Sequence, residues 1–146
     1  EASAGPQFSK IHENKNEDQL FKVLKKAQYL AAAMSLIIGL ILIMISPAIN
    51  VFLNIESINT FTIVLSILIF GYILNGYFAP IGTLFQMTFY ERLSLRAYIG
   101  GIVLGGPLLA FLMVSYGEVG LATGCMLIYL FRGVFLSQMF NKVFKL

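Results

Sequence analysis

Long apolar runs separated by short polar segments make up most of the chain after residue 26. The longest uncharged run, Ser57–Tyr90, has 34 residues, whereas ~20 apolar residues are enough for a helix to cross the ~30 Å hydrocarbon core of a bilayer. Two further uncharged runs lie between Lys26 and Glu56 and from Ala97 to Gly117. The pattern predicts an all-α integral membrane bundle of four transmembrane helices, spanning about 27–49, 58–89, 97–116 and 119–141.

The polar N-terminal segment, residues 1–16, is predicted to be the end of a preceding helix and a cytoplasmic loop. Asn14 with Glu17 resembles a capping box, so a helix is expected to start near residue 16. Glu17–Gln28 has an apolar and a basic side, which predicts a short amphipathic segment that rests at the membrane interface and runs into the first span. A solvated helix end without a special role is the alternative interpretation.

Proline and glycine mark the places where these helices are expected to end or bend. Pro47 lacks the backbone N–H that a helix needs, so the first span is predicted to end at Ser46-Pro47. A kink is expected near Asn75-Gly76 or Pro80, and another at Pro107. The polar segments Pro47–Asn59, Glu91–Arg96 and Ser115–Gly120 are predicted to be loops.

Small residues recur at intervals of four in three of the predicted spans. Ala31, Ser35 and Gly39 share one helix face, which lets another helix approach closely. Two GxxxG pairs are predicted to be helix-packing positions: Gly101 and Gly105, and Gly120 and Gly124.

Composition supports a membrane protein, because 58% of the residues are hydrophobic and only 12% are charged, against roughly 25% charged in soluble domains. Nine of the 10 Lys and Arg residues lie in the N-terminal segment, in the connection after the second span or at the C-terminus. By the positive-inside rule, both termini are predicted to lie in the cytoplasm of a multi-pass protein of the cell membrane. The basic residues flank apolar runs, so the lipid bilayer is the expected partner and no nucleic acid is.

Catalytic and cofactor-binding patterns are absent from the sequence. The predicted spans contain no Asp, Glu or His, and the only cysteine, Cys125, cannot form an internal disulfide. His12 lies in the polar N-terminal segment and is interpreted as a solvated surface residue. We therefore expect neither an enzyme nor a bound metal or other cofactor.

Arg132 is the candidate for a binding role. It lies ten residues before Lys142, hence about 15 Å along a helix axis and deep in the bilayer, where an arginine costs at least ~2.5 kcal/mol. No carboxylate of these spans can pair with it. It is expected to have a partner outside the chain or to face a hydrated cavity that admits an anion, unless it snorkels to the interface. Asn75 and Gln86 are weaker substrate-binding candidates, because an amide in a span usually bonds a neighbouring helix.

Three segments resemble the polysaccharide (O-antigen) flippases of the multidrug/oligosaccharidyl-lipid/polysaccharide transporter superfamily. Gly5–Leu20 is similar to a cytoplasmic loop of that family, and Asn75–Arg92 to a helix that ends before a short basic connection. Gly117–Thr123 is similar to the family's Gly-x-x-Gly-Ala-Ala-x-Ala-Thr. Leu121 stands where alanine is usual, and Glu91-Arg92 where Gly-Lys/Arg is usual.

The resemblance implies a C-terminal portion of a transporter that moves lipid-linked oligosaccharides across the membrane by alternating access. Arg132 would then meet the anionic pyrophosphate of the carrier lipid, and further transmembrane helices of the full-length protein would be partners. A first residue other than Met agrees with a piece of a longer protein. A multidrug or cation exporter of the same superfamily and a small four-helix membrane scaffold are the alternatives.

Overall fold

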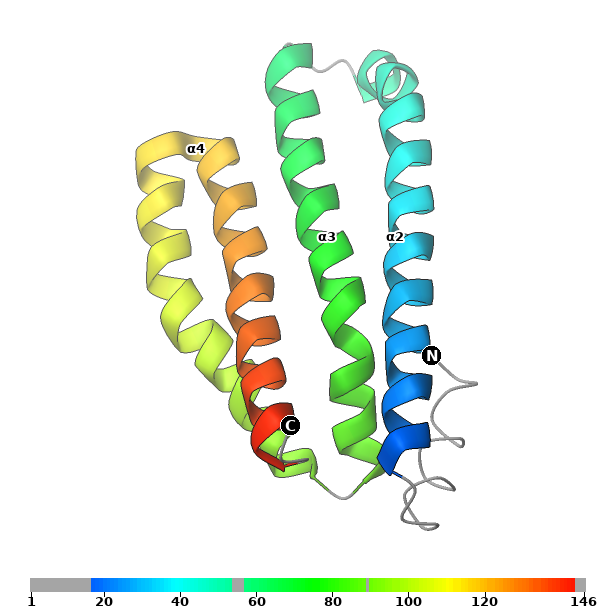
Figure 1. Ribbon diagram of the computed structural model, residues 1–146. Coiled ribbons are helices and arrows are strands. Elements are labelled where there is room, and N and C mark those ends of the chain that lie inside the picture. The colour runs from blue at the N-terminus through cyan, green and yellow to red at the C-terminus, as the bar shows by residue number, and fades with distance from the viewer. Residues whose placement is uncertain (1–16, 54–56, 89, 144–146) are drawn as a thin grey trace.

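The computed structural model describes residues 17–53, 57–88 and 90–143, and these residues form helices only. The helices are α2 (Glu17–Leu53), α3 (Ile58–Met87) and α4 (Glu91–Val143) (Figure 1). All three are long and apolar enough to cross a membrane, which confirms the prediction of an all-helical membrane protein at this level. The predictions for His12 and for the capping residue Asn14 lie outside the described residues.

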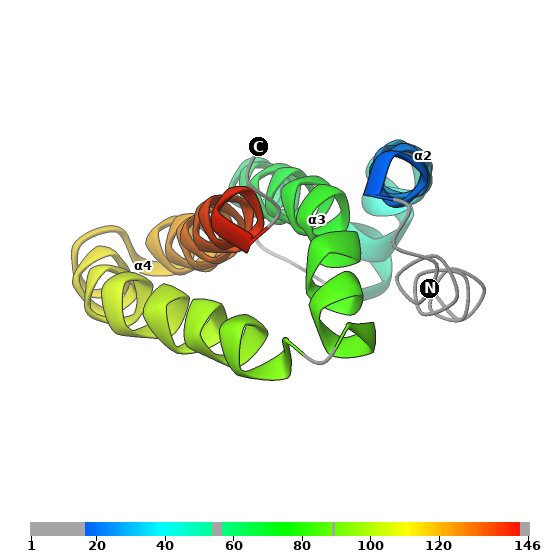
Figure 2. The ribbon, with the colours of Figure 1, turned by 60° about the horizontal axis from the view of Figure 1, so that its bottom comes forward.

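Helix α4 is folded back on itself at Gly117, whose backbone is not helical (φ 57°, ψ −129°). We call residues 91–116 the N-terminal arm of α4 and residues 118–143 its C-terminal arm; the two lie side by side (Figures 1 and 2). The positive φ of Gly117 is a conformation that residues with a Cβ rarely adopt. The predicted loop Ser115–Gly120 is therefore wrong in extent, because helical structure continues on both sides of this one residue.

Buried glycines line the contact between the two arms of α4. A methyl group at Gly101 would lie 3.3 Å from Cα of Arg132, and one at Gly124 would lie 2.6 Å from Cα of Leu109. An added methyl group would come still closer to the side chain of Ile128 at Gly105 and to the carbonyl of Leu112 at Gly120. These contacts pair residues of the two arms in an antiparallel register, and the absence of side chains is what lets the arms approach.

Helix α3 lies between α2 and α4 and packs along both (Figure 2). The buried core gathers at the end where α2 begins, α3 ends and α4 both begins and ends (Figure 1). There the ring of Phe21 in α2 stacks on Phe140 in α4, with centroids 6.3 Å apart. The buried residues of this core are Leu20, Leu24, Ile81, Leu84, Phe85, Ala97, Leu136 and Phe140.

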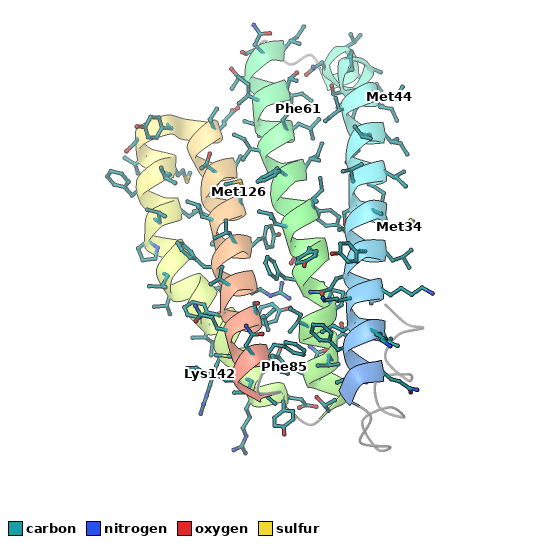
Figure 3. All side chains as sticks on the ribbon, in the orientation of Figure 1. Met34, Met44, Phe61, Phe85, Met126 and Lys142 are labelled. Atoms are coloured by element: carbon teal, nitrogen blue, oxygen red, sulfur yellow. The ribbon has the colours of Figure 1, made fainter. Side chains whose placement is uncertain are left out.

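The same end of the bundle carries most of the charge in the described residues, and we call it the basic end. Apolar side chains cover the outer surface along the rest of the helices; Met34 and Met44 of α2 are 54% and 81% exposed, whereas Phe85 lies inside at the basic end (Figure 3). An exposed apolar surface with a small interior core is the arrangement expected in lipid. The basic side chains of this end are those of Lys22, Lys25, Lys26, Arg92, Arg96 and Lys142.

The prediction that the first helix ends at Pro47 is wrong, because α2 continues to Leu53. Proline cannot donate to the carbonyl of Ile43, four residues earlier, but the hydroxyl of Ser46 donates to that carbonyl at 2.8 Å. Ser46 thus replaces the hydrogen bond that Pro47 removes. The last turns of α2 (cyan) are turned away from the axis of the preceding helix (Figure 1), so the proline redirects the helix without ending it.

The prediction of a loop over Glu91–Arg96 is also wrong, because α4 begins at Glu91. The amide of Leu93 donates to the carbonyl of Tyr90 at 2.9 Å, which starts the helix directly after the α3–α4 connection. An acidic residue in the first turn suits the positive end of the helix dipole. Helix α4 continues through Pro107. Helix α3 continues through Pro80 and changes direction in its bright-green C-terminal part (Figure 2).

Candidate functional site

Arg132 lies on the C-terminal arm of α4 and reaches the side chain of Asn75 in α3. Its Nη1 donates to Asn75 Oδ1 at 3.0 Å. The sequence predicted a partner for Arg132 outside the chain or a hydrated cavity; the structure adds a partner within the chain, since the amide of Asn75 bonds the guanidinium. The structure thus brings together two of the three predicted substrate-binding residues.

The ring of Tyr98, on the N-terminal arm of α4, covers the other side of the same guanidinium. Cζ of Arg132 lies 3.7 Å from the ring centroid, well inside the ~6 Å limit of a cation–π contact, which contributes ~0.5–2 kcal/mol depending on desolvation. Arg132 therefore joins α3 and both arms of α4 at one point. We call Arg132, Asn75 and Tyr98 the arginine cluster.

Small residues place these side chains next to one another. Gly101 follows Tyr98 by three residues and so lies on the same helix face. It packs on the backbone of Arg132 and thereby brings Tyr98 close to the guanidinium. On α3, Gly82 follows Asn75 by seven residues, again on one face, and a methyl group there would lie 3.7 Å from Nη2 of Arg132.

Ser94 adds a buried hydroxyl beside the cluster. Its side chain is 3% exposed, and within the described part of the chain its Oγ has no hydrogen-bond partner. A methyl group at Gly82 would lie 3.8 Å from this Oγ and 3.7 Å from Nη2 of Arg132, so the hydroxyl and the guanidinium flank the same glycine.

A groove of about 680 Å³ opens at the basic end between the last turn of α3 and the first two turns of α4. Tyr98 belongs both to this groove and to the arginine cluster. Gln86, the third predicted binding residue, is exposed on the groove wall, and its side chain is not part of the cluster. The groove residues are Gln86, Met87, Glu91, Arg92, Ser94, Leu95 and Tyr98.

A second groove of about 320 Å³ lies farther from the basic end, on the contact between α2 and α3. Aliphatic side chains form most of its surface, and Tyr72 of α3 and Tyr129 of α4 also line it. Its lining contains no charged side chain. This groove is therefore suited to hydrocarbon and offers no chemistry.

Tyr98 and Ser94 were not recognised from the sequence as members of the site. Ser94 was predicted to lie in a loop and Tyr98 in the first turn of a span. These predictions gave no indication that both residues lie close to Arg132. The spacing of Ser94, Tyr98 and Gly101 at i, i+4 and i+7 places the three on one face of a helix and could have indicated a shared surface. Within the described ranges, no group of His, Cys, Asp or Glu could hold a metal ion.

The chain was compared with known protein families, with curated proteins and with solved structures, and no match was found in any of the three. A function must therefore be argued from the fold and from the arginine cluster.

Proposed function

We propose that this chain is part of a multi-pass membrane transporter that flips lipid-linked oligosaccharide or polysaccharide precursors across the cell membrane by alternating access. The observation that supports this most is the position of the arginine cluster. A guanidinium lies about 15 Å from the basic end by helix rise, and one of its contacts, Tyr98, also lines an open groove. The sequence resemblance to polysaccharide flippases points in the same direction.

The proposal includes four membrane crossings, made by α2, α3 and the two arms of α4. Each arm of α4 has about 26 residues and would extend ~39 Å at 1.5 Å per residue, enough for a ~30 Å hydrocarbon core. Helix α2 begins and α4 ends at the basic end (Figure 1). Under the positive-inside rule this end faces the cytoplasm.

Arg132 is assigned to the anionic pyrophosphate of the carrier lipid. A guanidinium can donate two parallel hydrogen bonds to a phosphate, and such bonds gain strength where water is excluded. Asn75 orients the guanidinium through its 3.0 Å hydrogen bond. We assign Gln86, on the wall of the groove, to hydrogen bonds with sugar hydroxyls.

Substitution of Arg132 in the full-length transporter tests this assignment. Arg132→Ala should reduce glycan export about tenfold to a hundredfold, the loss expected for one hydrogen bond to a charged group. Arg132→Lys should fall between, because an ammonium keeps the charge but not the planar fork. Arg96→Ala, an exposed arginine of the same end outside the groove, is the matched control and should export normally. Normal export by both Arg132 variants, at equal protein level, rules the role out.

A structural scaffold is the second candidate, and the contacts of Arg132 favour it. The guanidinium bonds Asn75 and stacks on Tyr98 of the same chain, so it could serve only to join three helices. In that case Arg132→Ala would lower thermal stability and export together, and Arg132→Lys would lower both to a smaller degree. A cation exporter has less support, because an arginine in the span repels a cationic substrate.

A further inference from the structure

The groove at the basic end carries two opposite charges that the arginine cluster does not use. Glu91 and Arg92 are consecutive residues in the first turn of α4, both exposed, and both line the groove. Neighbouring helix positions do not face each other, so the carboxylate and the guanidinium lie apart on the groove wall. A ligand that spans the two must carry an anion and a cation a few bonds apart.

The anion side of the groove has more than one donor. Arg92 supplies a guanidinium at the positive end of the helix dipole, where the amides of Leu93 and Ser94 are already bonded to the carbonyl of Tyr90. Ser94 also lines the groove. It is only 3% exposed, and its Oγ has no hydrogen-bond partner in the described residues. A phosphodiester oxygen is an acceptor that would satisfy such a set.

Apart from the amide of Gln86, the remaining lining is formed by Met87, Leu95 and the ring of Tyr98. Met87 and Leu95 are 43% and 59% exposed and flank the charged residues in the groove. The groove lies between the end of α3 and the start of α4, and both helices are long and apolar enough to cross a membrane. It therefore lies at the level of the lipid headgroups. Charged groups beside exposed apolar side chains at that level match the boundary between a headgroup and its acyl chains.

We propose that this groove is a binding site for the headgroup of a zwitterionic phospholipid with a primary amine, as in phosphatidylethanolamine. Arg92 and the hydroxyl of Ser94 hold the phosphodiester, Glu91 accepts hydrogen bonds from the ammonium, and Met87 and Leu95 contact the start of the acyl chains. A choline headgroup has no N–H to donate to Glu91, and a glycerol headgroup brings no positive charge to it. The groove shares Tyr98 with the arginine cluster and Gln86 with the proposed substrate path, but the headgroup contacts assigned here do not include Arg132, so lipid binding can be measured without transport.

The absence of tryptophan from the sequence allows a single reporter to be placed in the groove. The 146-residue chain with Leu95→Trp is reconstituted in vesicles of bromine-labelled phosphatidylcholine, which quenches the tryptophan, and unlabelled phospholipids are mixed in as competitors. Recovery of fluorescence gives the affinity of each lipid relative to phosphatidylcholine. Tyr29→Trp, 66% exposed on α2 and outside the groove, is the matched reporter of ordinary bilayer contact. Met87→Trp, on the opposite wall, replaces Leu95→Trp if that variant does not fold.

At the groove reporter, phosphatidylethanolamine should bind about threefold to fivefold better than phosphatidylcholine or phosphatidylglycerol, the effect of about one interfacial charge pair. At Tyr29→Trp the three lipids should be equal within error. Glu91→Gln should remove the advantage of phosphatidylethanolamine and strengthen phosphatidylglycerol. Arg92→Gln should weaken phosphatidylglycerol, whereas Arg96→Gln, outside the groove, should change nothing.

Three results would overturn the assignment. Equal selectivity at both reporters would mean ordinary contact with the bilayer. Preference for phosphatidylglycerol that Glu91→Gln leaves unchanged would mean plain attraction of anionic lipid by the basic end. Competition by water-soluble phosphoethanolamine or inorganic phosphate as strong as that of the lipid would mean a soluble ligand.

Discussion

The guanidinium of Arg132 and the amide of Asn75 are 57 positions apart in sequence and 3.0 Å apart in the folded chain. The bond fixes the C-terminal arm of α4 to α3, two helices that are long and apolar enough to cross a membrane. Each residue gives the other a hydrogen-bond partner, and an unsatisfied polar group in hydrocarbon is costly. The pair is therefore a tertiary contact that specifies how α4 packs on α3. A substitution of either residue removes or changes this contact.

Asn75 separates the structural from the functional role of Arg132. Asn75→Ala removes the acceptor and should lower the free energy of unfolding in micelles by about 1–2 kcal/mol. Asn75→Asp places a carboxylate there and should restore or exceed the original stability, while it neutralises the guanidinium and reduces export of an anionic substrate. Asn141→Ala, an exposed amide on the same arm as Arg132, should change neither quantity. Full export by a stable Asn75→Asp variant would contradict an anion-binding role for Arg132.

Gly117 offers a test of the fold-back of α4 that involves no steric clash. Nothing lies within 4 Å of a methyl group placed on Gly117, but its φ of 57° is unfavourable for any residue with a side chain. Gly117→Ala should therefore destabilise the protein by ~1–3 kcal/mol through backbone strain alone.

Gly106 is the matched control for Gly117. It also has nothing within 4 Å of an added methyl group, but it lies in the helical part of the N-terminal arm. Gly106→Ala should leave the free energy of unfolding unchanged or raise it by up to ~1 kcal/mol, because alanine is the better helix former. Both free energies come from reversible unfolding in mixed micelles. Equal effects of the two substitutions would show that the strain at Gly117 does not matter.

Helix existence was predictable from the sequence because it depends on local properties. The uncharged runs gave the positions of α2 and α3, and the residues around Gly117 indicated a change of direction between Gly101 and Arg132. The helix ends were less predictable. Pro47 stays within α2 because the hydroxyl of Ser46 satisfies the Ile43 carbonyl, and this bond depends on a rotamer that a sequence pattern does not specify.

The arginine cluster was only partly predictable, for a different reason. Arg132 and Asn75 could each be identified as unusual, since polar side chains in a span are costly. Their mutual contact depends on the register between α3 and the C-terminal arm, and on the close approach of the arms at Gly101. These are tertiary relationships between segments far apart in the sequence. Tyr98 enters the cluster for the same reason, although nothing in its own neighbourhood sets it apart from the other tyrosines.

The proposed four crossings predict which sites an impermeant thiol reagent can reach. With Cys125 replaced by Ser, single cysteines at Arg96 and Lys142 should react from the cytoplasmic side only, because both lie at the basic end. A cysteine at Glu118, beside the turn of α4, should react from the opposite side. Labelling in intact cells and in inverted vesicles measures this. Reaction of the Glu118 and Lys142 variants from the same side would exclude a crossing by the C-terminal arm.

The hydrogen bond between Ser46 and Ile43 predicts a non-additive pair of substitutions. Ser46→Ala leaves the Ile43 carbonyl without its 2.8 Å donor at a position that is 4% exposed, and should cost about 1 kcal/mol of stability. Pro47→Ala restores a backbone N–H that can donate to the same carbonyl. In that background Ser46→Ala should cost much less. The four proteins form a double-mutant cycle, and unfolding in mixed micelles gives the coupling. A coupling free energy of zero would mean that Ser46 does not compensate for Pro47, and that another feature keeps α2 helical to Leu53.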